Sequence, residues 1–220
     1  MMDEFLAERQ EVLAAVRRIV DAGLVSGSSG NVSRRIRRAE GDLYAVTASR
    51  VPYHRFSIEH VLVVDGDVDP VHGDGVPSSE SLVHLAVYRA RRDVDAVIHT
   101  HSVYASAFAV AGVAIPPVLD EQVITLGGAV EVAAYGASAS DALASNAVTA
   151  LGRQAAVLLR HHGGLGVGTD LDEAFAVVEL VERVARVRLL SAQLGGGELP
   201  AALVESEQRV YRMMKGFKEG

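Results

Sequence analysis

Short apolar runs alternate along this chain with longer segments of helical periodicity, and this alternation restricts the fold more than any other feature. The two most apolar runs, Val94–His101 and Ala155–Arg160, have the length of strands and lie between helical patterns. A strand that is apolar along its whole length is buried on both faces, so helices must cover both sides of its sheet. The sequence therefore predicts an α/β domain in which a mixed sheet lies between helices.

The same patterns give the expected boundaries of each element. Helices are expected over residues 3–22, 78–92, 102–110, 138–151, 170–194 and 201–218. Strands are expected over residues 43–47, 61–64, 68–71, 94–101, 130–134, 155–160 and 163–168, and Asp65-Gly66 predicts that the second and third form a hairpin. No helix or strand is predicted for the Gly- and Ser-rich segment 24–38. Residues 1–220 are expected to form a single domain with a helical tail from about residue 198.

Composition excludes several kinds of chemistry. The 220 residues include no cysteine, and the only lysines are Lys215 and Lys218, near the carboxyl terminus. A thiolate nucleophile, a Cys-ligated zinc, a buried Schiff-base lysine and a phosphate-loop lysine are therefore not expected. The net charge of −7 argues against nucleic-acid binding. The amino terminus lacks the pattern of a signal peptide and no apolar run is long enough to span a membrane, so a cytoplasmic protein is expected.

Four histidines lie at the ends of the two most apolar runs. His99 and His101 are two residues apart on a strand, so their side chains point to the same face and can reach one ion. His161 and His162 follow the other run, and because neighbours on a strand face opposite ways, one of the two is expected to join the first pair. Three imidazoles and an open position are typical of catalytic zinc, although other divalent metals also accept imidazole ligands.

Two further segments have the composition of anion-binding sites. Pro77, Ser78 and Ser79 begin a predicted helix, whose first amides are unpaired and carry partial positive charge. Glu80 follows in what is expected to be the first helical turn, where it would stay ionised and could contact a metal or act as a base. The loop of residues 27–33 contains small residues with free amides and hydroxyls, which suit a phosphate-binding nest.

Taken in order, these segments resemble the class II aldolase/adducin family from about Gly23 to Glu182. GLVSGSSGNVS resembles the family's phosphate loop, VTASRVPY its second phosphate segment, and PSSE its phosphate-and-glutamate motif. HTH resembles the first pair of metal ligands and HHG contains the third. The family's fold, implied here, is a three-layer α/β/α arrangement with a central mixed, largely antiparallel sheet. Family members are usually homotetramers with active sites between subunits.

The resemblance implies a role for each matching residue. His99, His101 and His162 would bind zinc or another divalent transition metal, and Glu80 would be the acid/base that completes the metal shell before substrate arrives. A substrate phosphate would be bound by Ser28, Asn31, Ser49, Ser78 and Ser79.

The chain departs from the family pattern in two places, which supply further candidates. Ala48 and Arg50 replace a proline and a glycine of the phosphate segment, and the arginine would either fill the pocket or bind an anion. Asp120 and Glu121 lie where sugar-phosphate aldolases often carry a catalytic tyrosine, whereas epimerases and dehydratases use an acidic residue there. Tyr211 in the last helix would either reach a neighbouring site or pack against the helix's own surroundings.

The function implied by the resemblance is that of a zinc-dependent aldehyde-lyase. It would cleave a small ketose phosphate by a retro-aldol reaction, through a zinc-stabilised enediolate, to dihydroxyacetone phosphate and an aldehyde. Metal stabilisation in place of a lysine iminium agrees with a lysine-poor sequence. An epimerase, dehydratase or decarboxylase acting on a related sugar phosphate is the alternative, and a non-catalytic scaffold like the adducin head is a third hypothesis.

Overall fold

One sheet organises the computed structural model, which describes residues 4–217. Its strands are β1 (Asn31–Ile36), β2 (Leu43–Thr47), β3 (Val61–Val64), β4 (Pro70–His72), β5 (Ala96–Thr100), β6 (Val132–Ala133), β7 (Ala156–Leu159) and β8 (Gly163–Gly168). Its helices are α1 (Leu6–Asp21), α2 (Ser81–Ala90), α3 (Val103–Ala111), α4 (Asp120–Leu126), α5 (Asp141–Leu151), α6 (Leu171–Ala192) and α7 (Ala201–Met214). The expected start of the first helix at residue 3 and the expected end of the last at Lys218 lie outside the described residues.

The strands follow the order β4-β3-β2-β1-β5-β8-β7-β6 across the sheet. Neighbouring strands are antiparallel at every step except β6 and β7, which are parallel. The predicted mixed, largely antiparallel sheet is thus confirmed. The hairpin is also present, because β3 and β4 pair on either side of the turn that begins at Asp65.

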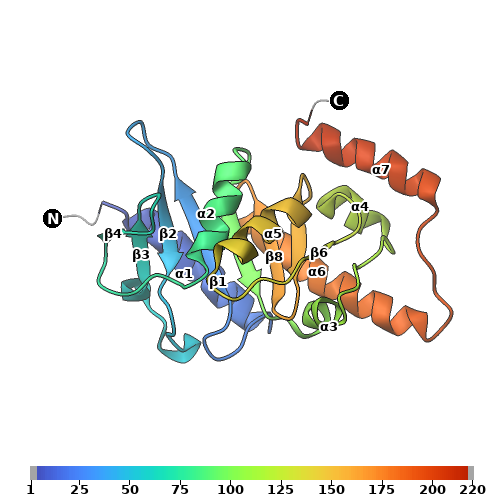
Figure 1. The fold of residues 1–220 in the computed structure, drawn as a ribbon, viewed down its shortest axis with the longest axis horizontal. Coiled ribbons are helices and arrows are strands. Elements are labelled where there is room, and N and C mark those ends of the chain that lie inside the picture. Colours follow the sequence, from blue (N-terminus) through green and yellow to red (C-terminus); the bar gives the residue numbers. More distant parts are fainter. Residues whose placement is uncertain (1–3, 218–220) are drawn as a thin grey trace.

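Helices cover both faces of this sheet, as the apolar strands require (Figure 1). In Figure 1, α2 and α5 lie in front of the sheet, and α1 and α6 lie behind it. Successive residues of β5 alternate between these two layers: Val97 packs in the core beneath α2 and α5, whereas Ala96 and Ile98 pack against α1 and α6. Ala96, Val97 and Ile98 are apolar because each of these side chains enters a core, one on either face of the sheet in turn.

Strand β8 contains glycine at four of its six positions, and this lets α6 approach the sheet closely. Leu165 and Val167 face the core under α2 and α5. On the other face, a Cβ at Gly166 would lie 2.6 Å from Cγ1 of Val178, and a Cβ at Gly168 would lie 2.6 Å from the backbone nitrogen of Ala174. Helix α6 therefore packs directly on the strand's backbone.

Two elements were not expected from the sequence. β1 lies inside the segment that had no predicted structure, and it occupies a central place beside β5. Its Arg35 is buried, and the guanidinium donates to the carbonyl oxygens of Tyr88 and Arg91, at 2.5 and 3.1 Å. The short helix α4 begins at Asp120, three residues after Pro117.

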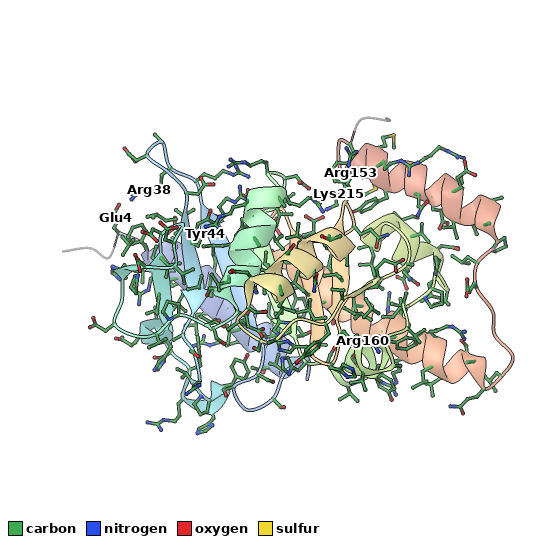
Figure 2. The ribbon with its side chains drawn as sticks, in the orientation of Figure 1. Glu4, Arg38, Tyr44, Arg153, Arg160 and Lys215 are labelled. Atoms are coloured by element: carbon green, nitrogen blue, oxygen red, sulfur yellow. The ribbon has the colours of Figure 1, made fainter. Side chains whose placement is uncertain are left out.

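The last helix, α7, lies beside α4 at the edge of the molecule (Figure 1). Tyr211 is buried against Gly127, and its hydroxyl donates to the carbonyl oxygen of Arg153 at 2.9 Å. Lys215, labelled near Arg153 in Figure 2, forms an ion pair with Glu173 of α6. Among residues 4–217, no helix combines the length and the apolar composition needed to cross a bilayer.

Candidate metal centre

The three predicted histidine ligands meet at one end of the antiparallel pair β5 and β8. Thr100 at the end of β5 lies opposite Gly164 near the start of β8, so residues that follow β5 lie beside residues that precede β8. His99, His101 and His162 consequently form a cluster in which the potential ligand nitrogens all lie within 4.8 Å of one another. Their ring centroids are 4.8 to 4.9 Å apart and the rings are close to perpendicular.

β7 ends at Leu159, one residue before the expected end at Arg160. His161 and His162 therefore lie in the turn between β7 and β8 and do not continue the strand. His161 has a left-handed backbone with φ of 58°, and its exposed side chain points toward the ring of Tyr135, 6.2 Å away. His162 alone of this pair faces the other two histidines. The turn, rather than strand alternation, sends the two neighbouring side chains in different directions.

The protonation states of these histidines suit metal binding. The Nδ1–H of His99 donates to the carbonyl oxygen of Gly164 at 2.9 Å, which leaves the lone pair of Nε2 directed at the cluster. Burial, followed by the neighbouring His101 and His162, holds the pKa of His99 well below its usual value. Burial and His162 likewise lower the pKa of His101. Neutral imidazoles are the form that coordinates a metal.

A divalent cation fits this donor set. The Nε2 atoms of His99 and His101 lie 2.9 Å apart, where two bare lone pairs would repel each other unless a proton or a cation lies near both. Three imidazoles with a carboxylate beside them are ligands that zinc accepts. His99, His101, His162 and Glu80 are therefore the residues of this chain that would hold such an ion.

Glu80 lies against the histidine cluster from a different element. Its Oε2 is 3.1 Å from Nε2 of His99, and its Oε1 is 3.0 Å from Nε2 of His162. The carboxylate is buried, and it occupies the N-cap position of α2 instead of the first turn, because the helix begins one residue later at Ser81. This end position lets the side chain leave the helix and face the sheet.

The predicted phosphate-binding residues line one cavity together with this centre. The cavity has a volume of about 170 Å³ and is lined by Ser28, Ser29, Gly30, Asn31, Ala48, Ser49, Arg50, Ser78, Ser79, Glu80, His101 and His162. Two hydrogen bonds join its walls: the Ser49 amide donates to Val76 at 2.8 Å and the Ser78 amide donates to Thr47 at 3.0 Å. Serine residues therefore line the space beside the histidines.

Gly30 permits the close contact between this loop and the histidine strand. Its φ is 79°, and a Cβ at this position would lie only 2.6 Å from the carbonyl oxygen of His99. Only glycine fits such an approach without displacement of the backbone. Asn31, the next residue, lies opposite His99 in the register of β1 and β5, and its Nδ2 donates to Oε2 of Glu80 at 3.4 Å.

Three further sequence candidates lie outside the cavity of this chain. Asp120 and Glu121 are exposed in the first turn of α4, and Glu121 forms an ion pair with Arg183 of α6. Tyr211 is enclosed under α7, where burial raises its pKa to about 12. The structure thus gives Tyr211 the packing role that was one of its two interpretations.

Two further residues lie near Glu80: Ser138, which was not a candidate, and His84, which was expected to be a partner on the helix face and not a metal ligand. Ser138, in the loop before α5, donates its hydroxyl to Oε1 of Glu80 at 2.9 Å. His84, one turn after Glu80 on α2, is buried with its Nδ1 2.7 Å from Oγ of Ser33, which in turn lies 2.7 Å from the hydroxyl of Tyr88. Burial lowers the pKa of His84 to about 3, with His99 adding to the effect. A serine in a small-residue loop carries no pattern that marks it as a neighbour of a site, whereas the helical spacing of His84 from Glu80 does.

Comparison with known proteins places these residues in a family. The family model described as "Class II Aldolase and Adducin N-terminal domain" matches residues 10–189, a range that contains every residue lining the cavity. The chain is a class II aldolase/adducin family member. The family resemblance of its sequence motifs is thereby confirmed.

Individual relatives are similar over nearly the whole chain. The 5-deoxy-D-ribulose 1-phosphate aldolase of Bacillus thuringiensis serovar kurstaki is 32% identical, with 96% of each chain covered. The L-fuculose phosphate aldolase of Haemophilus influenzae is 31% identical over 91% of this chain and 90% of that protein. A solved structure of L-fuculose 1-phosphate aldolase is 31% identical and superposes with a TM-score of 0.88, covering 96% of this chain and 98% of that one.

Proposed function

We propose that this family member is a metal-dependent aldolase that cleaves a small ketose phosphate to dihydroxyacetone phosphate and an aldehyde. The observation that carries the proposal is the meeting of three imidazoles, a buried carboxylate and a serine-lined wall at one cavity. Two relatives of this chain are named as aldolases of sugar phosphates, which agrees with such a substrate.

Retro-aldol cleavage moves one electron pair and two protons. The carbon–carbon bond breaks, its electron pair stays with the ketone fragment, and the hydroxyl that becomes the aldehyde loses a proton. The carbon that gained the electron pair then takes up a proton, so the two products together contain the atoms of the substrate. Zinc held by His99, His101 and His162 would supply Lewis-acid stabilisation of the negative charge that develops.

Glu80 is the group of this chain placed to move a proton. Its two oxygens face His99 and His162, and the hydroxyl of Ser138 holds Oε1. A carboxylate fixed beside the reacting atoms transfers a proton without the delay of reorienting. Glu80 would return the proton to carbon, while the hydroxyl and amide groups of Ser28, Asn31, Ser49, Ser78 and Ser79 bind the phosphate and hold the far end of the substrate.

The proposal includes a homotetramer in which a neighbouring subunit completes each site. Large apolar side chains are exposed on α3 and α7 and just after α6, among them Val103 at 72%, Met213 at 72% and Leu194 at 89%. Exposed apolar side chains of this kind are typical of surfaces that contact another chain. Analytical ultracentrifugation measures the assembly directly, and a monomer at micromolar concentration would contradict it. A cytoplasmic location stays a prediction.

The test combines a substrate panel with a matched pair of variants. The zinc-loaded protein is incubated with ketose 1-phosphates and products are followed by NMR. His162→Asn is expected to lose bound zinc and activity together, because it removes one ligand. His161→Asn is the control, since that neighbouring side chain points away from the cluster. Glu80→Gln is expected to retain zinc and lose turnover.

Each contrary outcome has a clear meaning. Undiminished zinc in His162→Asn would reject the ligand assignment, and full activity in Glu80→Gln would remove this carboxylate from the mechanism. Epimerised, dehydrated or decarboxylated products in place of cleavage would replace the aldolase by one of the alternative reactions. A wild-type protein that binds no stoichiometric divalent metal would favour the scaffold hypothesis.

A further inference from the structure

Arg50 holds an energetically unfavourable backbone conformation at the wall of the cavity. Its φ is 60°, in the left-handed region where a side chain clashes with the following carbonyl oxygen and where glycine is the favoured residue. Such a conformation in a residue other than glycine persists where the surroundings impose it, and it is concentrated at functional sites. An arginine kept at this position therefore needs an explanation beyond the turn itself.

The surrounding backbone fixes Arg50 at this place. The preceding residue, Ser49, donates its amide to Val76, and Ala48 pairs with Pro77 in an isolated bridge. Three residues after Arg50, the amide of Tyr53 donates to the carbonyl oxygen of Gly27 at 2.9 Å. Arg50 is thus tied on both sides to the loops that form the cavity.

The guanidinium of Arg50 is exposed and has no ionic partner among residues 4–217. Other arginines of the chain are engaged: Arg35 donates to two buried carbonyl oxygens, and Arg91 pairs with Asp93 at 2.6 Å. Of the described residues that line the cavity, Glu80 is the sole carboxylate, and Ser138 and the histidines already contact it. The cation of Arg50 is therefore available to a ligand.

Apart from the metal site at the histidines, Arg50 is the charged donor among the described residues that line this cavity, and serines make up the wall beside it. Ser28, Ser49, Ser78 and Ser79 line the cavity beside it. Hydroxyl and amide donors bind an anion without neutralising it, whereas a planar guanidinium adds a full charge and two parallel hydrogen bonds to phosphate oxygens. In a protein with a net charge of −7, the free cation of Arg50 adds, beyond the metal site, to the cavity's attraction for a doubly charged group.

We propose that Arg50 determines specificity by binding the substrate's phosphate dianion, so that the site selects phosphorylated sugars over sugars that carry one carboxylate or no charge. This inference rests on the proposed function, because it assigns the group that holds the substrate's far end. The strained backbone is then the structural cost of placing a cation where a glycine would fit more easily.

The test measures binding of inorganic phosphate to the zinc-loaded protein by calorimetry, which requires no turnover. Arg50→Gly is expected to bind phosphate roughly tenfold to hundredfold more weakly, the loss typical of a charge-assisted hydrogen-bonded pair. The same variant is expected to unfold at an equal or higher temperature, since glycine relieves the strain. Arg50→Gln should bind as weakly as Arg50→Gly, because it removes the charge and keeps a side chain. Arg55→Gln, which removes another exposed arginine nearby, is the control and should bind phosphate like the wild type.

Several results would overturn the inference. Unchanged or tighter phosphate binding by Arg50→Gly would show that the side chain is idle or obstructs the cavity. Acetate binding as tight as that of phosphate would contradict the selection for a dianion. Arg50-dependent phosphate binding without cleavage of any ketose phosphate would reject the proposed function alone, whereas cleavage with phosphate binding that is independent of Arg50 would reject this inference alone.

Discussion

Replacing His84 with asparagine should reduce the fall in the free energy of unfolding that accompanies acidification below pH 6.5. His84 is buried on α2 behind Glu80, and burial lowers its pKa from 6.5 to about 3. In the folded protein the imidazole therefore stays neutral at pH 5, whereas the unfolded chain takes up a proton there. Since the unfolded state binds more protons, the free energy of unfolding must fall as the pH falls below 6.5.

The size of this effect follows from the two pKa values. Each pH unit between them contributes about 1.4 kcal/mol, so acidification from pH 6.5 to pH 5 lowers the stability by about 2 kcal/mol through His84 alone. Asparagine does not titrate in this range and keeps a polar group near Ser33. His84→Asn should therefore be less stable than the wild type at pH 7, and about 2 kcal/mol of that difference should disappear at pH 5.

Urea unfolding at pH 7 and pH 5 measures the difference. The protein is first stripped of metal with a chelator, so that loss of a bound ion on acidification does not contribute. His54→Asn, a change at an exposed histidine, serves as the control and should keep the wild-type pH dependence. An equal gap between wild type and His84→Asn at both pH values would refute the reasoning, because it would mean that His84 takes up a proton as readily in the fold as in the unfolded chain.

The remaining predictions concern the contacts of Glu80 and Gly30. Ser138→Ala removes the hydrogen bond to Oε1 of Glu80, worth about 1 kcal/mol, so kcat should fall about fivefold while the zinc content and KM stay constant; Ser138→Thr should restore the rate. Gly30→Ala places a Cβ 2.6 Å from the carbonyl oxygen of His99, so it should lower the stability by at least about 1 kcal/mol and weaken zinc binding, as denaturation and metal titration would measure. A kcat equal to that of the wild type in the first variant, or wild-type stability in the second, would contradict these contacts.

Much of the fold could be predicted because its strands are buried on both faces. The apolar runs that form β5 and β7 must be buried in a water-soluble chain, which favours central strands. The histidines at their ends predict the position of the site from the sequence alone. The resemblance to the family's motifs identified His162, and not His161, as the third metal ligand. The structure supports that choice through the turn at His161, whose left-handed backbone turns one ring away and leaves the next facing the cluster.

The parts that escaped prediction depend on contacts between distant residues. β1 has the sequence NVSRRI, whose arginines and serine suggest exposure, yet Arg35 is buried because carbonyl oxygens of α2 and the residues after it accept its hydrogen bonds. The start of α2 was expected at Ser78. The Ser78 amide instead donates to Thr47 and its carbonyl oxygen accepts from Ser81 in a turn, so that Glu80 becomes the cap. These contacts join residues that are distant in the sequence, so the local pattern of residues does not predict them.

The glycines of β8 bear on how this enzyme family member could be re-engineered. A library that varies Gly166 or Gly168 would push α6 off the sheet, and the displacement would travel along the strand to the turn that carries His162. Ser28 and Arg50 line the cavity from loops and are exposed, so they do not hold a helix against the sheet as the glycines of β8 do. Substitutions in the loops should therefore change the substrate range at little cost in stability, whereas substitutions at Gly166 and Gly168 should disturb the strand that follows the third histidine.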